Sequence, residues 1–211
     1  MVNTGDKFLK QQNFYDFRLF STLGFTQEEV EHFTKLPEVK AAEGLKTVDA
    51  LMEYEGESRP FKLFSMPENI NLPSLTAGRM PESDTECLAD DVKFQKKDIG
   101  TVIRLADDNE ESINSQISYK EYTIVGLVDS PLYLGLDRGS TSIGSGAIYG
   151  FLYLPEGNFI GEYFTEIDIT LKETATIYSD EYETLIERQE EKITKLCKEL
   201  VDKRYEDVLS A

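Results

Sequence analysis

The stretch DFRLFSTLGFTQEEVEHFTKLPEVKAAEGL, residues 16–45, decides the fold of this chain. Its first seven residues, 16–22, alternate apolar and polar side chains, which is typical of a half-buried strand. Thr26 and Glu29 then match a capping box, which closes the first turn of a helix, and apolar residues follow at helical spacing up to a proline. We interpret residues 39–45 as a returning strand. The stretch therefore predicts a strand, a helix and a second strand.

The segment that follows predicts a hairpin and then a long connection. Residues 47–54 and 60–64 have the composition of paired strands, and Glu55-Gly56-Glu57-Ser58 between them is typical of a turn. Residues 67–81 contain three prolines and Gly78. We interpret them as a crossover between two subdomains, because proline and glycine interrupt regular structure.

The middle of the chain contains short segments rich in β-branched or aromatic residues, which predict further strands. Asp107 to Glu111 form an acidic loop, and residues 135–150 carry five glycines, which indicates an extended loop. Residues 155–158, Pro-Glu-Gly-Asn, are typical of a turn. The predicted strands cover residues 86–89, 101–105, 119–128, 146–154 and 164–171.

The C-terminal end has a different pattern from the rest of the chain. From Ser179 onward there is no proline or glycine, and mostly apolar residues recur every three or four positions between charged ones. This pattern predicts a long amphipathic helix, which either docks on a sheet or continues as a coiled-coil stalk. The stripe consists of Tyr182, Leu185, Ile186, Gln189, Ile193, Leu196, Leu200 and Val201.

We expect the two halves of this helix to behave differently. The stripe from Tyr182 to Ile193 should pack on the domain, because exposed leucine and isoleucine at that density favour aggregation. The far half is charged enough to stand in solvent, as its residues Lys198, Glu199, Asp202, Lys203 and Arg204 indicate.

Composition excludes some classes of function. The 211 residues carry a formal net charge of -18, which repels phosphate backbones and argues against nucleic-acid binding. Two cysteines, Cys87 and Cys197, do not define a disulfide framework. The single histidine, His32, lies in a helical stretch, where a surface or core role is more common than metal binding. A zinc site built from cysteine and histidine is therefore excluded.

The sequence lacks the common catalytic and cofactor motifs. It has no phosphate-binding P-loop and no nucleophile elbow G-x-S-x-G that His32 would serve as a base. The run from Gly144 to Gly150 is one residue too long for a dinucleotide-binding loop, and it precedes a strand where that site needs a helix. The acidic loop at 107–111 lacks the glycine and the downstream glutamate of an EF-hand. We predict no enzymatic activity, no cofactor, and no catalytic or metal-binding residue, and we identify no ligand-binding residue.

Neither a membrane span nor a leader is visible in these residues. No run approaches the ~18 apolar residues that cross a bilayer, and the first six residues do not form a signal peptide. The chain is therefore either cytosolic or an excised piece of a longer protein.

Three further stretches resemble a known family by their order and spacing. They are Leu75-Thr76-Ala77-Gly78-Arg79-Met80-Pro81, Asp98-Ile99-Gly100-Thr101-Val102-Ile103 and Tyr122-Thr123-Ile124-Val125-Gly126-Leu127-Val128. Together they resemble the extracytoplasmic domain of FtsX/MacB-type ABC-transporter permeases, also called the MacB-like periplasmic core domain. The opening residues 13–26 resemble the Gram-positive form. The resemblance covers about residues 13–172; the glycine-rich segment is not part of the family pattern.

The resemblance implies an α+β fold with a discontinuous architecture. An α/β, porter-like subdomain would be built from both chain ends, with a mostly β subdomain inserted in the middle. We therefore expect Phe17 or Leu19 to contact the strand 166–171. The predicted division is residues 14–66 and 147–178 for the α/β subdomain, 73–134 for the inserted subdomain, 135–146 for the glycine-rich loop and 179–211 for the C-terminal helix or stalk.

The resemblance also implies a function and partners. The permease would pair with a cytoplasmic ATPase and a second permease through membrane helices absent from this chain. The domain, a soluble fragment on the extracytoplasmic side of the cell membrane, would transmit ATP-driven motion or contact a substrate such as a peptide, lipid or lipoprotein. Two alternatives stay open: a stand-alone secreted or surface ligand-binding module, and a hydrolase with an unrecognised pair of carboxylates.

Overall fold

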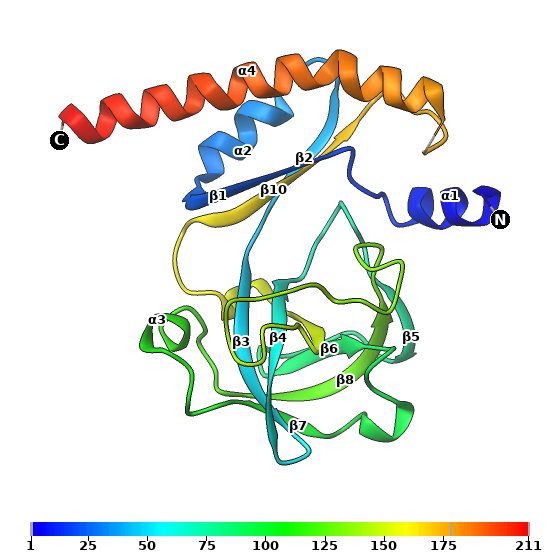
Figure 1. Ribbon diagram of the computed structural model, residues 1–211, viewed down its shortest axis with the longest axis vertical. Coiled ribbons are helices and arrows are strands. Elements are labelled where there is room, and N and C mark those ends of the chain that lie inside the picture. Colours follow the sequence, from blue (N-terminus) through cyan, green and yellow to red (C-terminus); the bar gives the residue numbers. More distant parts are fainter. Residues whose placement is uncertain (1, 178, 211) are drawn as a thin grey trace.

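The computed structural model describes residues 2–177 and 179–210 (Figure 1). Residues 1, 178 and 211 lie outside the described residues, so the last residues of the predicted ranges 147–178 and 179–211 are not covered. A three-stranded sheet with helices on one side occupies one end of the molecule, and a seven-stranded sheet occupies the other (Figure 1). The fold is α+β, as predicted.

The three-stranded sheet joins segments from both ends of the chain. Its order is β1-β10-β2, with both pairs antiparallel. Phe17 pairs with Ile169 and Leu19 with Ile167, so the predicted contact between these segments is confirmed. The strands are β1 (Phe17–Phe25), β2 (Val39–Leu45) and β10 (Phe164–Leu171), and the covering helices are α2 (Gln27–Thr34) and α4 (Asp180–Ser210).

The seven-stranded sheet closes on itself. Its order is β5-β8-β6-β9-β4-β3-β7, and β7 pairs again with β8, so six strands form a ring and β5 lies beside β8. The β4–β9 and β6–β8 pairs are parallel. The strands are β3 (Thr47–Tyr54), β4 (Glu57–Ser65), β5 (Ser74–Gly78), β6 (Glu86–Asp90), β7 (Val102–Leu105), β8 (Glu121–Asp129) and β9 (Gly150–Leu154).

Sheet membership differs from the prediction for three strands. We expected β3, β4 and β9 in the α/β subdomain, but their hydrogen bonds place them in the closed sheet. The physical reason is the pairing of distant strands: β3 pairs with β7 and β4 pairs with β9, so Val48, Ala50, Met52 and Tyr54 point into the core of the closed sheet. The chain changes sheets at Lys46, between β2 and β3, rather than after residue 66. How the chain divides into folding domains stays a prediction.

Several short elements complete the fold. The predicted crossover at 67–81 contains β5, which sequence analysis missed because proline and glycine dominate that segment. The N-terminal helix α1 (Val2–Gln11) was not predicted either. Short helical turns are α3 (Glu111–Asn114) and the 3₁₀ turns at Lys96–Asp98 and Glu156–Asn158. No helix within the described ranges combines the length and apolar character needed to cross a membrane.

Two glycines from separate family-like stretches meet where β5 pairs with β8. Gly78 lies opposite Gly126, and Gly78 has a positive φ of 77°. A Cβ on Gly126 would lie 2.5 Å from the backbone oxygen of Arg79, and one on Gly78 would lie 2.2 Å from that of Val125. Glycine is therefore required at both positions, because real Cβ atoms do not approach backbone this closely.

We predict that Gly126→Ala destabilises the protein by about 1–3 kcal/mol, because the added methyl group overpacks against backbone. Gly135→Ala is the matched control, since a Cβ there meets nothing within 4 Å. Urea unfolding followed by circular dichroism measures both variants. Equal midpoints for the two variants would contradict the close approach of β5 and β8.

Candidate functional site

The capping box at Thr26 fixes the start of α2 and places two acidic side chains in its first turn. The Thr26 hydroxyl accepts a hydrogen bond from the Glu29 backbone N–H at 3.2 Å, and the Glu29 carboxylate accepts one from the Thr26 N–H at 2.6 Å. Glu28 and Glu29 therefore sit at the positive end of the helix dipole. From there they face the far half of α4.

The apolar stripe of α4 packs on the three-stranded sheet, as predicted. Leu185 and Ile193 are buried in one cluster with Ile167 and Ile169 of β10 and with Phe33 of α2. Packing extends further than predicted, since Leu200 is only 9% exposed. The stripe therefore holds the helix to the domain from Tyr182 to Leu200, about five turns at 3.6 residues per turn.

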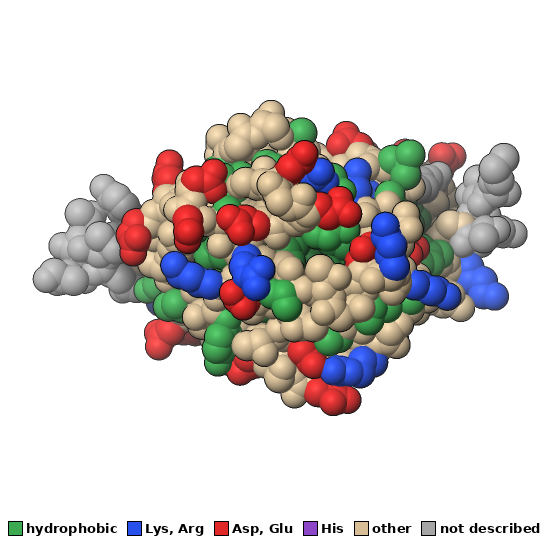
Figure 2. All heavy atoms as spheres, turned by 90° about the horizontal axis from the view of Figure 1, so that it is seen from below, with side chains coloured by type: hydrophobic (Ala, Val, Ile, Leu, Met, Phe, Trp, Pro, Cys, Tyr) green, Lys and Arg blue, Asp and Glu red, His purple; other side chains and the backbone are tan. Residues whose placement is uncertain are grey.

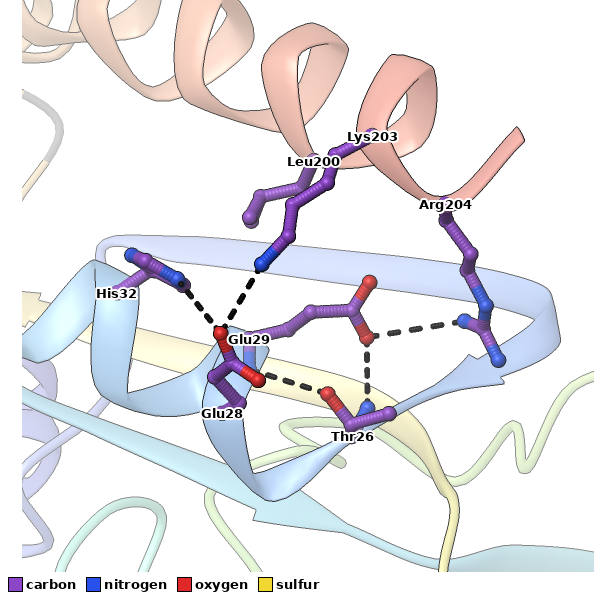
Figure 3. A pocket seen from close by; sticks show the side chains of 7 residues that line it. All are labelled: Thr26, Glu28, Glu29, His32, Leu200, Lys203 and Arg204. Atoms are coloured by element: carbon purple, nitrogen blue, oxygen red, sulfur yellow. Dashed lines mark hydrogen bonds and ion pairs between the residues drawn. The ribbon is translucent and has the colours of Figure 1, made fainter. Parts of the chain in front are cut away.

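Ion pairs join the far half of α4 to α2 (Figure 3). Lys203 Nζ lies 3.1 Å from Glu28 Oε1, and Arg204 Nη1 lies 3.6 Å from Glu29 Oε2. Arg204 also donates a hydrogen bond to the Gly24 carbonyl at 2.6 Å. Lys198, Glu199, Asp202 and Lys203 are exposed, as expected, and only Arg204 is half-buried. The far half of α4 nevertheless does not stand free of the domain, because Lys203 and Arg204 reach the acidic first turn of α2.

The contact between the far half of α4 and the first turn of α2, which we call the junction, pairs opposite charges. The hydrogen bond and charge of Lys203 lower the pKa of the Glu28 carboxyl. His32 Nε2 also approaches Glu28 Oε1, at 3.5 Å (Figure 3). These groups and Leu200 line a cavity of about 120 Å³. Exposed ion pairs contribute under about 1 kcal/mol each, so burial of Leu200 dominates the attachment and the charges set its position.

An apolar groove of about 610 Å³ opens beside the junction, between β1 and α4. Phe20, Leu23 and Val201 form its exposed walls and are 72%, 75% and 67% accessible. Buried Phe33 forms part of its base. The charged groups along it, Arg18, Glu29 and Arg204, are all engaged in ion pairs. The groove is therefore suited to hold an apolar group.

Sequence analysis did not identify this groove. Cys197, Leu200 and Val201 line one side of it, and residues 18–21 and 23–25 line the other. Burial raises the pKa of the Cys197 thiol, which favours the uncharged form. Val201 belongs to the apolar stripe predicted for the helix, beyond the part expected to pack, and it faces outward.

The other residues singled out in the sequence lie elsewhere. Cys87 is buried in the core of the closed sheet, where desolvation raises the pKa of its thiol.

In the acidic loop, the Asn109 side chain accepts a hydrogen bond from the Leu51 N–H and donates one to the Leu51 carbonyl, which fixes the loop on β3. Among the described residues, no three His, Cys, Asp or Glu side chains cluster as metal ligands would. No described nucleophile hydrogen-bonds to His32.

The three family-like stretches converge on β8. The first contains β5, which pairs with β8, and the third is β8 itself. The second approaches β8 through the Gly100 N–H, which donates to the Ile124 carbonyl at 2.8 Å. Arg79 of the first stretch holds Glu86 through two hydrogen bonds and lowers the pKa of that carboxyl to about 2. These residues shape the closed sheet and form no catalytic arrangement.

The surface at the opposite end of the molecule from α4 carries both kinds of charge. Acidic and basic side chains are spread among polar and apolar ones across this face (Figure 2). No single basic stripe of the kind that follows a nucleic-acid backbone gathers there. This face gives no reason to place a site on it.

Comparison with solved structures finds similar folds in transporter domains. The extracellular domain of the noncanonic ABC-type transporter YknZ from Gram-positive bacteria aligns with 76% of this chain and 82% of its own, at 11% identity and a TM-score of 0.45. The periplasmic region of MacB from Actinobacillus actinomycetemcomitans aligns with 81% of this chain and 75% of its own, at 10% identity and a TM-score of 0.41. No family profile and no curated protein matches the sequence.

We predict that Leu200→Ala destabilises the protein by about 2 kcal/mol, the lower end of the range for a buried leucine. Val201→Ala is the matched control and should change stability by less than about 0.5 kcal/mol, since Val201 is exposed. Urea unfolding gives the free energies. In the Leu200→Ala variant alone, the backbone amides of α4 beyond residue 196 should also lose protection from hydrogen exchange. Equal behaviour of the two variants would refute docking of the far half of α4.

Proposed function

We propose that this chain is the extracytoplasmic domain of an FtsX/MacB-type ABC-transporter permease. The domain transmits ATP-driven motion through α4 and accepts an apolar part of its substrate in the groove between β1 and α4. In this proposal the permease pairs with a cytoplasmic ATPase and a second permease, and the domain lies on the extracytoplasmic side of the cell membrane. It has no catalytic role of its own.

The observation that carries the proposal is the form and docking of α4. The helix has 31 residues, about 45 Å at 1.5 Å per residue, and contains no glycine or proline. Its apolar face is packed on a sheet made from β1, β2 and β10. A continuous helix resists bending. Force applied along α4 therefore reaches the three-stranded sheet directly.

The ordered sequence stretches give independent support. They resemble this permease family, and in the structure they assemble around β8 with glycines where no Cβ fits. The closed sheet that they shape is inserted between β2 and β10, so the α/β part draws on both ends of the chain. The resemblance implies that architecture.

The groove supports the substrate part of the proposal. Its exposed walls are aromatic and aliphatic, and its charged groups are paired within the protein. A peptide, lipid or lipoprotein would offer an apolar group that fits such a surface. A stand-alone ligand-binding module would use the same groove, so the test addresses motion rather than binding.

We predict that a Gly-Pro pair inserted after Lys195 in the intact permease abolishes transmission of motion, because it interrupts the helix. An Ala-Ala pair at the same place is the matched control. It causes the same shift in packing but keeps the helix continuous. A spin label at Lys97→Cys in a Cys197→Ser background reports distances between the closed sheets of two permeases when ATP is added.

The expected result is an ATP-dependent distance change in the parent and in the Ala-Ala variant, and none in the Gly-Pro variant. Circular dichroism must show that the domain stays folded in both. An unchanged response in the Gly-Pro variant would contradict the proposal, because α4 would then only cover the sheet and would not transmit motion. Loss of the response in both variants would assign the effect to packing and contradict the connector.

A further inference from the structure

The underside of the three-stranded sheet, which faces away from the helices, is charged and buried. Along β10, Ile167 and Ile169 point to the helices, whereas Glu166 and Asp168 point to the opposite face. Both carboxylates are almost inaccessible to solvent, and the Asp168 side chain is 0% exposed. The sheet therefore buries two acidic groups close together on its lower face.

One arginine serves both carboxylates. Arg18 of β1 lies opposite Asp168 in the strand register. Its Nη2 contacts Glu166 Oε1 at 2.5 Å, and its Nε lies 3.3 Å from Asp168 Oδ1. Among the described residues, neither Arg18 Nε nor Asp168 Oδ1 makes an aligned hydrogen bond. Glu166 thus holds the arginine, and Asp168 is left with excess buried negative charge when ionised.

A segment of the closed sheet is tied to this charged face. Residues 66–73, which we call the strap, leave β4, cross under the three-stranded sheet and lead to β5. Asn71 Nδ2 donates to Asp168 Oδ2 at 2.5 Å. The Glu43 carboxylate of β2 accepts the backbone N–H groups of the strap at 2.6, 3.0 and 2.8 Å, from Glu68, Asn69 and Ile70.

The N-terminal segment holds the strap from its other side. The Asn71 and Leu72 N–H groups donate to the carbonyls of Asn13 and Gln12 at 3.1 and 2.9 Å. Asn71 also takes a left-handed conformation, with a φ of 56°. Asn71 is therefore the residue at which strap, N-terminal segment and charged face meet.

We propose that protonation of Asp168 controls how firmly the strap is held against the three-stranded sheet, and we call this arrangement the latch. With its carboxyl protonated, the cluster under the sheet is closer to neutral and the strap stays seated. Loss of the proton places a second negative charge beside Glu166 in a buried site, and the strap then opens more often because water must reach the carboxylate. The latch belongs to the fold and does not rest on the proposed permease role.

The surrounding charges support this assignment. The pKa of Asp168 is raised to about 7: burial is the largest cause, Glu166 and Glu43 add to it, and Arg18 and the Asn71 hydrogen bond oppose it. The phenols of Tyr15, Tyr133 and Tyr153 also lie close enough to interact with the charge of Arg18. Because the seated state binds the proton more tightly than an open, hydrated state, opening increases as pH rises from about 4 to 7 and then levels off.

Hydrogen exchange of the strap amides, residues 68–72, tests the latch in the unmodified chain. After correction for intrinsic exchange rates, their protection should fall by up to about tenfold per pH unit between pH 5 and 7, the limit for one linked proton. It should change little between pH 7.5 and 8.5. Protection that stays constant from pH 5 to 7 would overturn the proposal without any variant.

Three substitutions assign the effect. Asp168→Asn should remove the pH dependence and keep the strap protected, because the amide stays neutral. Asp107→Asn, at an exposed position, should behave as the parent. Glu166→Gln should move the window to lower pH, since Arg18 then pairs with Asp168 alone and favours its ionised form. A parent-like pH dependence in Asp168→Asn would assign the proton to another group and refute the latch.

Discussion

The alternation of side chains along β10 is the constraint on which the rest of the structure depends. This strand lies in the middle of the three-stranded sheet, and both of its faces are covered, because residues 166–171 are all buried. Ile167, Ile169 and Leu171 require an apolar cover, which α2 and α4 provide. Glu166 and Asp168 require a cation and hydrogen-bond donors, which Arg18 and Asn71 provide. A one-residue shift in register would exchange the two faces and leave both uncovered.

The elements predicted well are those whose signals are local. The capping box at Thr26 and Glu29, the turn predicted at residues 55–58 and formed at 55–56, and the apolar stripe of α4 each depend on residues within a few positions of one another. Sheet membership depends on distant partners instead. The sequence of β3 predicts a strand in a hairpin, but only the pairing of β3 with β7 and of β4 with β9 decides which sheet contains that hairpin.

The candidate site could be predicted only in part for a similar reason. Leu200 and Val201 are adjacent, so on a helix their side chains point about 100° apart and cannot both face one sheet. That signal was available in the sequence. No such signal identifies the opposing wall of the groove, Phe20 and Leu23, because its distance from α4 depends on how β1 and α4 pack. Likewise, the acidic residues of β10 have the pattern of a solvated face, and only the strap and the N-terminal segment show that they are buried.

The two faces of the three-stranded sheet differ in how they respond to force. The helix face is an apolar contact of Leu185, Ile193 and Leu200 with the sheet, and separating it exposes hydrocarbon to water. The opposite face consists largely of hydrogen bonds and ion pairs, which water replaces as the surfaces part, so its net contribution is small. A pull on α4 therefore moves the helix and the sheet together. Displacement should then appear at the strap, between the three-stranded sheet and the closed sheet, where proton uptake by Asp168 sets how firmly the two are joined.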